Sequence, residues 1–327
     1  MNCKRISALV LAFAMTASAA AFAAEGETDP ADGDLPLLIS ANPDTERYDT
    51  AITVNGKRVD SYTYSRSIPG WGSETVTVEL TELPRVAAGY VPMRAVAQAD
   101  YGSATWYEGD GYSSFFMGGA RFTVHFEDLS VEVNDQTVEG VSALLIDGVT
   151  YLPVSVFEGL EGFSVTDSSS DGSECYEIGT PNGAPLMKLA YEIAGDSSLI
   201  RGGKRTMEEM EEWYGELGFK AEYTTEGVAF LPMMTYPDTL VLGKMAEGQE
   251  EALGAFLEAY RANQEGTFSW YLGQHLPKVQ NAKFVTEGDW FLFLIAEDAE
   301  AGVETFRAAV QEMESGASYM VPVVKEN

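Results

Sequence analysis

Over residues 48–180 the polar and apolar residues alternate in short runs, which is the pattern of half-buried β-strands. The alternation occurs at Ile52–Val54, at Thr75–Leu80 and at Phe122–Phe126. Asn55-Gly56 follows the first run, and this dipeptide is typical of a two-residue hairpin turn. The pattern therefore predicts a strand-rich N-terminal region.

Two segments of this region share one pattern, Gly89–Ala97 and Gly148–Phe157. Each has an aromatic residue, an aliphatic residue and a proline, followed by further apolar residues. Proline is favoured at the first position of a helix, where its missing N–H group would have no partner, so each segment is predicted to be a strand leading into a short helix. Gly102 is expected to end the first helix. New strands are expected at Thr105–Tyr107 and Phe163–Val165.

In the C-terminal part the apolar residues recur at helical spacing, and helices are also expected over Leu186–Ile193 and Met207–Leu217. Two stripes have the i, i+3, i+4, i+7 type of spacing: Leu253, Phe256, Leu257 and Tyr260, and Val303, Phe306, Val310 and Met313. Strands are predicted at Thr239–Leu242, Ala282–Val285 and Trp290–Ala296. The last of these is continuously apolar up to Ile295, which predicts a central strand covered on both faces.

These elements predict an α+β protein of two domains. Residues 48–180 would form a strand-rich module with two short helices, and residues 185–327 a β-α-β-β-α module in which helices pack on a sheet. A stretch rich in serine, glycine and proline ends near residue 184, and it places the boundary between the two.

The first residues have the three parts of a secretory signal peptide: the bases Lys4 and Arg5, the apolar run Ala8–Phe22, and small residues before a cut after Ala23. Residues 1–23 are therefore predicted to direct export, and the acidic, proline-containing residues 24–47 to form a flexible leader. The expected location is secreted, extracellular or in the cell envelope.

The excess of acidic residues limits the classes of partner that the protein is expected to bind. The chain has 51 acidic and 20 basic residues and a formal net charge of -31, so binding to nucleic acid or to anionic lipid is not expected. Beyond the leader, no stretch approaches the 20 or so apolar residues that a spanning helix needs, so no membrane span is expected either.

The N-terminal module resembles the copper amine oxidase N-terminal-like domain, often called a stalk domain and common in exported bacterial proteins. The resemblance covers roughly residues 48–180 and rests on Asn55–Lys57, Tyr90–Ala97, Ala104–Trp106 and Asp147–Val154. It implies an α+β stalk or spacer module rather than a catalytic domain.

The C-terminal module resembles a family of uncharacterised domains found in exported and lipid-anchored bacterial proteins. The resemblance covers roughly residues 215–315 and implies a location but no activity. It rests on Tyr236–Thr239, Tyr260–Gln264, Tyr271-Leu272, Asn281–Lys283 and Trp290–Leu294.

The residue content offers little for metal chemistry. Copper oxidases use several imidazoles, whereas this chain has only His125 and His275. Structural zinc usually takes four cysteine or histidine ligands. The predicted cleavage would remove Cys3 and leave three, Cys175, His125 and His275. Asp167–Gly172 is similar to the start of a calcium loop, but Ser169 and Ile178 stand where ligands belong, so a solvated loop is favoured. No metal and no cofactor are expected.

A serine or cysteine nucleophile needs a base within reach, and no nucleophile motif accompanies either histidine, so no catalytic residue is assigned. The sequence predicts a non-catalytic exported stalk or binding protein that contacts cell-wall polysaccharide or an extracellular protein. The alternative is a carbohydrate-active hydrolase that uses two of the many carboxylates.

The candidate binding residues are Trp106, Tyr107 and Tyr112, which surround the glycines of Gly109–Gly111. Exposed aromatic side chains on a loop could contact a sugar or a peptide. The favoured interpretation is structural: alternate aromatic residues would pack inward from two strands that this turn connects.

Overall fold

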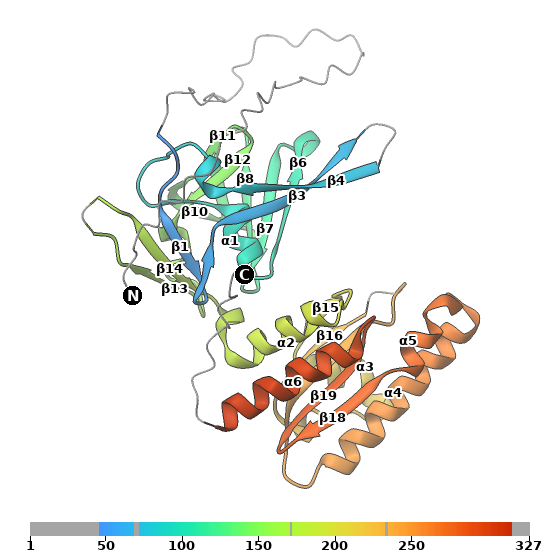
Figure 1. Ribbon diagram of the computed structural model, residues 1–327. Helices are drawn as coiled ribbons and strands as arrows, with labels where there is room; N and C mark the ends of the chain where they lie inside the picture. The colour runs from blue at the N-terminus through green and yellow to red at the C-terminus, as the bar shows by residue number, and fades with distance from the viewer. Residues whose placement is uncertain (1–45, 69–71, 171, 233–234, 316–327) are drawn as a thin grey trace, which may run out of the picture. The chain divides into compact units, whose positions relative to one another are not determined.

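The computed structural model describes residues 46–68, 72–170, 172–232 and 235–315. The chain divides after Thr180 into two compact units (Figure 1). Both combine helices with sheets, which confirms the predicted α+β class. The predicted signal peptide, residues 1–23, lies outside the described residues, as does the predicted leader except for Glu46 and Arg47.

The described part of the first unit contains four sheets. A five-stranded antiparallel sheet has the order β10 (Gln136–Ser142), β9 (Ser130–Val133), β8 (Ala120–His125), β7 (Tyr112–Met117) and β6 (Ser103–Tyr107). A four-stranded sheet has the order β13 (Ser164–Asp167), β14 (Cys175–Gly179), β1 (Ala51–Val54) and β2 (Lys57–Val59), in which β1 and β14 are parallel. The others are β11 (Leu144–Ile146), β12 (Val149–Pro153) and β5 (Tyr90–Pro92), and the ribbon of β3 (Ser61–Ile68) and β4 (Gly72–Glu79).

The two repeated segments pair with each other. β5 and β12 are antiparallel with Val91 opposite Leu152, so each repeat's proline lies opposite the other repeat's tyrosine. β5 leads into α1 (Met93–Ala99) and β12 into the short 3-10 helix Val154–Phe157, and the new strands β6 and β13 follow as predicted. Pro92 and Pro153 are the last strand residues and cap these helices, so their predicted place inside the first helical turn is wrong by one residue.

The core of the first unit lies between α1 and the sheets. Met93 and Ala95–Ala97 on the helix are buried, as are Phe122 and Val124, whose alternation along β8 was predicted. Phe122 contacts Phe157 edge to face, with ring centroids 5.5 Å apart. The predicted Asn55-Gly56 turn connects β1 to β2 and has positive φ at both residues.

A buried carboxylate joins distant parts of this unit. The side chain of Asp100 is fully buried, and it accepts hydrogen bonds from Asn55 Nδ2 at 2.7 Å, from Thr180 Oγ1 and from the backbone N–H of Gly118. Burying a polar side chain is costly unless hydrogen bonds satisfy it, and these three bonds do so. They attach the last residue of the unit to the β1–β2 turn and to the end of α1.

The second unit is built on one antiparallel sheet in the order β15 (Gly203–Arg205), β16 (Thr224–Leu231), β17 (Thr239–Met245), β19 (Trp290–Ile295) and β18 (Lys283–Glu287). Residues of α2 (Pro185–Asp196) and α6 (Ala299–Glu314) cover one face. Residues of α3 (Met207–Tyr214), α4 (Glu250–Trp270) and α5 (Leu276–Gln280) cover the other, giving three layers (Figure 1).

The predicted β-α-β-β-α order is present as β17, α4, β18, β19 and α6, with α5 added after α4. β19 is buried along its whole length, as its continuous apolar sequence predicted. Its side chains alternate between the two cores, with Phe291, Phe293 and Ile295 in one and Trp290, Leu292 and Leu294 in the other. The sequence did not predict β15 or β16, so the sheet has two more strands than expected.

A half-buried carboxylate on α2 gives a prediction on pH and stability. Burial, and then the nearby Asp196, raise the pKa of Glu192. Because the folded state holds this proton more tightly than the unfolded chain, the wild type loses stability as the pH rises from the ordinary glutamate pKa through the raised one. Glu192→Gln is therefore expected to stabilise the protein by about 0.3 kcal/mol or more at pH 7.5, the scale of a like-charge pair on a helix.

The gain should disappear near pH 4, where the carboxyl is protonated in both states, and urea denaturation at the two pH values measures it. Glu304→Gln makes the same charge change at an exposed position of α6 and is the control. An equal gain from both variants would assign the effect to net charge rather than to the burial of Glu192.

Candidate functional site

The first unit contains a groove of about 1020 Å³, at the upper end of the range for small-molecule sites. The ribbon β3–β4 supplies one side, and α1 and the edge strand β6 supply others; these elements can be followed in Figure 1. Three aromatic residues line the groove, Tyr62, Tyr64 and Trp106, together with two arginines, Arg47 and Arg94. Two exposed acids, Glu82 and Asp147, also line it.

Strand geometry places the aromatic residues. Tyr62 and Tyr64 are two positions apart on β3, so both side chains project from the same side of the strand. Tyr62 is buried, and burial raises the pKa of its hydroxyl. Trp106 is 36% exposed and packs against Phe126 with ring centroids 4.3 Å apart, which supports the indole ring from behind.

The three predicted binding residues do not lie on one face. β6 and β7 pair so that Tyr107 is opposite Tyr112, and these two rings stack at 4.6 Å. Trp106 is the neighbour of Tyr107 along the strand, so its side chain projects from the opposite face of the sheet. Of the three, the groove includes Trp106, while Tyr107 and Tyr112 form a pair beside His125 on the other face.

Arg94 occupies the helix side of the groove. Its Nη1 donates a hydrogen bond of 3.3 Å to the backbone oxygen of Ala104 on β6. Burial lowers the pKa of the guanidinium, and the nearest titratable groups are the neutral hydroxyls of Tyr62 and Tyr64 rather than a carboxylate. The structure thus holds a half-buried cation that has no ion pair with any described acid.

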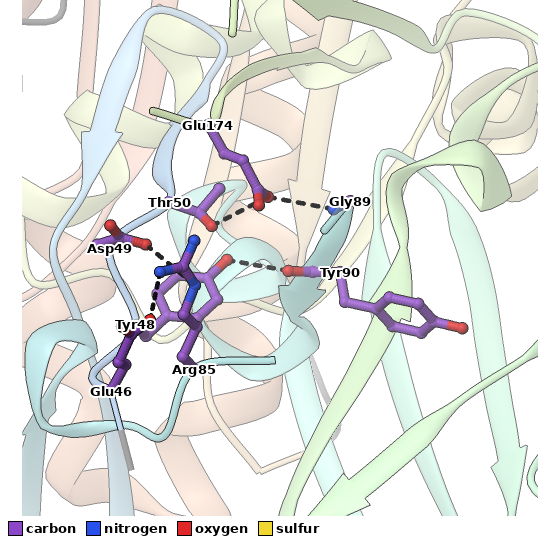
Figure 2. A network of polar contacts seen from close by, with 8 residues as sticks. All are labelled: Glu46, Tyr48, Asp49, Thr50, Arg85, Gly89, Tyr90 and Glu174. Carbon is purple, nitrogen blue, oxygen red and sulfur yellow. Dashed lines mark hydrogen bonds and ion pairs between the residues drawn. The ribbon is translucent and has the colours of Figure 1, made fainter. Parts of the chain in front are cut away.

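A network of polar contacts fixes the segment that carries Arg47 (Figure 2). Arg85 donates to Glu46 Oε2 at 2.5 Å and lies 3.9 Å from Asp49 Oδ1, and these acids raise the pKa of the guanidinium. Tyr48 lies between the two acids in sequence and donates its hydroxyl to the backbone oxygen of Tyr90 at 3.1 Å. The side chains of Glu46 and Asp49 thus attach this segment to Arg85, and that of Tyr48 attaches it to the backbone of Tyr90.

The second part of the network extends to Glu174. Its Oε2 accepts hydrogen bonds from Thr50 Oγ1 at 3.3 Å and from the backbone N–H of Gly89 at 3.1 Å (Figure 2). The neighbouring Arg47 donates from Nη1 to the backbone oxygen of Glu82 at 2.7 Å. The network consequently holds Arg47 at the edge of the groove, where it forms no ion pair with an acid of the described ranges.

Sequence patterns did not identify four of these five groove residues. Tyr62 and Tyr64 alternate with polar residues, which is a signal for a strand face but does not say what that face borders. Arg94 stands out as a charge within the apolar run Val91–Ala97, and this was the clearest available signal. Arg47 was assigned to the leader.

The structure also places the residues that were considered for metal binding and catalysis. Among the described residues, no group of three or more histidine, cysteine or acidic side chains could hold a metal ion. His125 Nε2 lies 3.4 Å from Glu132 Oε1, and His275 packs against Tyr236 in the other unit. The Asp167 loop joins β13 to β14, and Asp167 accepts a hydrogen bond from the N–H of Ser169 that lowers its pKa.

The second unit has a smaller pocket of about 400 Å³ around Lys278. The ammonium of Lys278 lies 3.2 Å from each oxygen of Asp238 and 3.2 Å from Glu297 Oε2. Asp238 also accepts a hydrogen bond from the N–H of Ile200. Since three acceptor oxygens surround the three N–H donors, this cluster joins α5 to the sheet and leaves the ammonium no unused donor.

Comparison of the chain with protein-family models, with curated proteins and with solved structures finds no match. Within the part of the chain that the structure describes, no helix combines the length and the apolar character that crossing a bilayer requires.

Proposed function

We propose that the protein is a non-catalytic binding protein of the cell envelope or the extracellular space, whose first unit holds a segment of a polymer in the groove. The observation that carries this proposal is the pair of partly exposed aromatic side chains, Tyr64 and Trp106, along a groove of about 1020 Å³. Planar aromatic faces with a polar edge suit the alternating apolar and hydroxyl surfaces of a sugar chain.

The remaining support comes from the sequence. Residues 1–23 have the layout of a signal peptide, and residues 48–180 resemble the copper amine oxidase N-terminal-like stalk domain. Residues 185–327, on their resemblance to an exported α+β family, are assigned to a second binding or assembly module. Cell-wall polysaccharide is the proposed partner.

The hydrolase alternative requires two carboxylates in one cleft, one of them with a raised pKa. Glu192 has a raised pKa, but it lies on α2 in the second unit, outside the groove. The groove does hold two acids, Glu82 and Asp147, but both are exposed to solvent rather than desolvated, so the geometry supports binding better than hydrolysis.

Trp106→Ala is expected to weaken retention of the purified protein on isolated cell-wall polysaccharide by about tenfold, the scale of one lost aromatic contact. Co-sedimentation over a range of polymer concentrations measures it. Trp213→Ala is the matched control, because this tryptophan is 55% exposed on α3 and lies in the other unit. Failure of the wild type to sediment, or equal loss in both variants, would refute the proposal.

A further inference from the structure

Two arginines that line the groove have no ion pair within the described part of the first unit. Six arginines occur in its described part, and four of them form ion pairs with acids: Arg58 with Asp60, Arg66 with Glu74, Arg85 with Glu46, and Arg121 with Asp135. Arg47 and Arg94 form no such pair with any acid that the structure describes, and both line the groove.

This distribution is unexpected for the charge of the chain. With 51 acids and 20 bases, a basic side chain has many potential partners, and a half-buried charge is usually paired because removing it from water is costly. A guanidinium has five N–H donors, and Arg94 uses one of them on Ala104. The remaining donors form the planar fork that binds a carboxylate through two parallel hydrogen bonds.

We propose that the ligand of the groove is an acidic polysaccharide, a chain of sugars that bear carboxylates. Arg94 binds one carboxylate, Arg47 at the edge binds another, and Tyr64 and Trp106 contact the sugar rings. This inference rests on the proposed function and specifies the ligand class of the same groove.

The backbone around the groove argues against an extended peptide. A peptide that adds to a sheet needs free N–H and C=O groups on an edge strand. On the β6 side, the oxygen of Ala104 already accepts a hydrogen bond from Arg94. On the β3 side, the N–H and C=O of Thr63 both pair with the side-chain amide of Gln98, at 2.9 and 2.7 Å. An added peptide strand would therefore lose backbone hydrogen bonds at Ala104 and at Thr63.

The net charge of the chain works against the binding of an acidic polymer. A protein with a formal charge of -31 repels polyanions at long range, so non-specific electrostatics favours a neutral polymer over an acidic one. A preference for the acidic form can therefore arise only from local cations. The groove supplies two of them, and only Arg94 is half-buried; Arg47, Glu82 and Asp147 are exposed to solvent and more strongly screened.

The experiment compares hexagalacturonic acid with its fully methyl-esterified form by titration calorimetry on the purified full chain. The acid is expected to bind about tenfold more tightly than the ester. Arg94→Gln should reduce binding of the acid about tenfold and leave the ester unchanged, and Arg47→Gln should act in the same direction. Arg58→Gln makes an identical charge change outside the groove and should have no effect.

The possible outcomes separate a failure of this inference from a failure of the proposed function. If both forms bind equally and only Trp106→Ala weakens them, the inference is wrong while the proposed function stands. If neither form binds, the inference fails, while the proposed function is decided by the co-sedimentation experiment. If hexaglutamate binds as tightly as the acid sugar and depends equally on Arg94, the ligand is an acidic peptide and the inference is overturned. Thermal melting of each variant confirms that it is folded, and Arg47→Gln tests the same point from an exposed position.

Discussion

Replacing Lys278 by methionine is expected to lower the free energy of unfolding by about 3–5 kcal/mol, the usual cost of removing one partner of a buried ion pair. Asp238 is 0% exposed and Lys278 is 10% exposed, so the variant would leave the carboxylate buried without its cation. The loss should be visible in urea denaturation at neutral pH as a lower midpoint with an unchanged slope.

Lys283→Met provides a matched control in the same unit. Lys283 pairs with Glu300 at the surface, and an exposed pair is worth about 0–1 kcal/mol. The double variant Lys278→Met with Asp238→Asn removes both buried charges, so it should regain much of the lost stability. If Lys278→Met cost no more than Lys283→Met, burial of the pair would have no energetic weight and the structural assignment of the cluster would be wrong.

Gly102→Ala is expected to cost about 3 kcal/mol, the upper part of the usual range for overpacking. A Cβ atom at this position would overlap the backbone oxygen of Phe116 and lie 2.8 Å from the backbone oxygen of Ala97. Both obstacles are main-chain atoms, one on β7 and one on α1, so neither can move aside as a side chain would. Thermal or urea denaturation measures the loss.

Gly109→Ala is the matched control on the neighbouring turn. A Cβ atom there would meet no atom within 4 Å, and Gly109 has no positive φ, so the change should be nearly neutral. Equal stability of the two alanine variants would show that β7 and α1 can separate at Gly102, contrary to the close approach described.

The sequence predicted a glycine at the end of the first helix, but the structure requires Gly102 for a different reason. It was expected to end the first helix as the left-handed residue, but Tyr101 has that conformation, with φ of 60°. Tyr101 N and Gly102 N donate to the oxygens of Gln98 and Ala97, the two hydrogen bonds of a Schellman motif. Glycine was correctly predicted near the helix end, yet it is required by a contact with Phe116, fourteen residues away.

The spacing of apolar residues predicted those helices and strands whose own sequence has a clear period. The apolar stripe of α4 is buried at all four predicted positions, and the repeated aromatic-aliphatic-proline segments both form strands that lead into helical turns. β15 is a three-residue strand containing Lys204 and Arg205, and so short a polar segment has no recognisable period. Its place in the sheet comes from pairing with β16 rather than from its own composition.

By itself the sequence determined the α+β class, the segments that form most strands and helices, and the scarcity of imidazoles and thiols, because spacing and composition are properties of the chain alone. Only the tertiary structure decided that Trp106 turns toward the groove while Tyr107 turns away, and that Arg47 and Arg94 lie beside the same aromatic surface. The pairing of β6 with β7 sets which way Trp106 and Tyr107 point. The folding of residues 46–50 onto residues 82–90 brings Arg47 to the groove. Both depend on contacts between residues far apart in the chain, which no local pattern encodes.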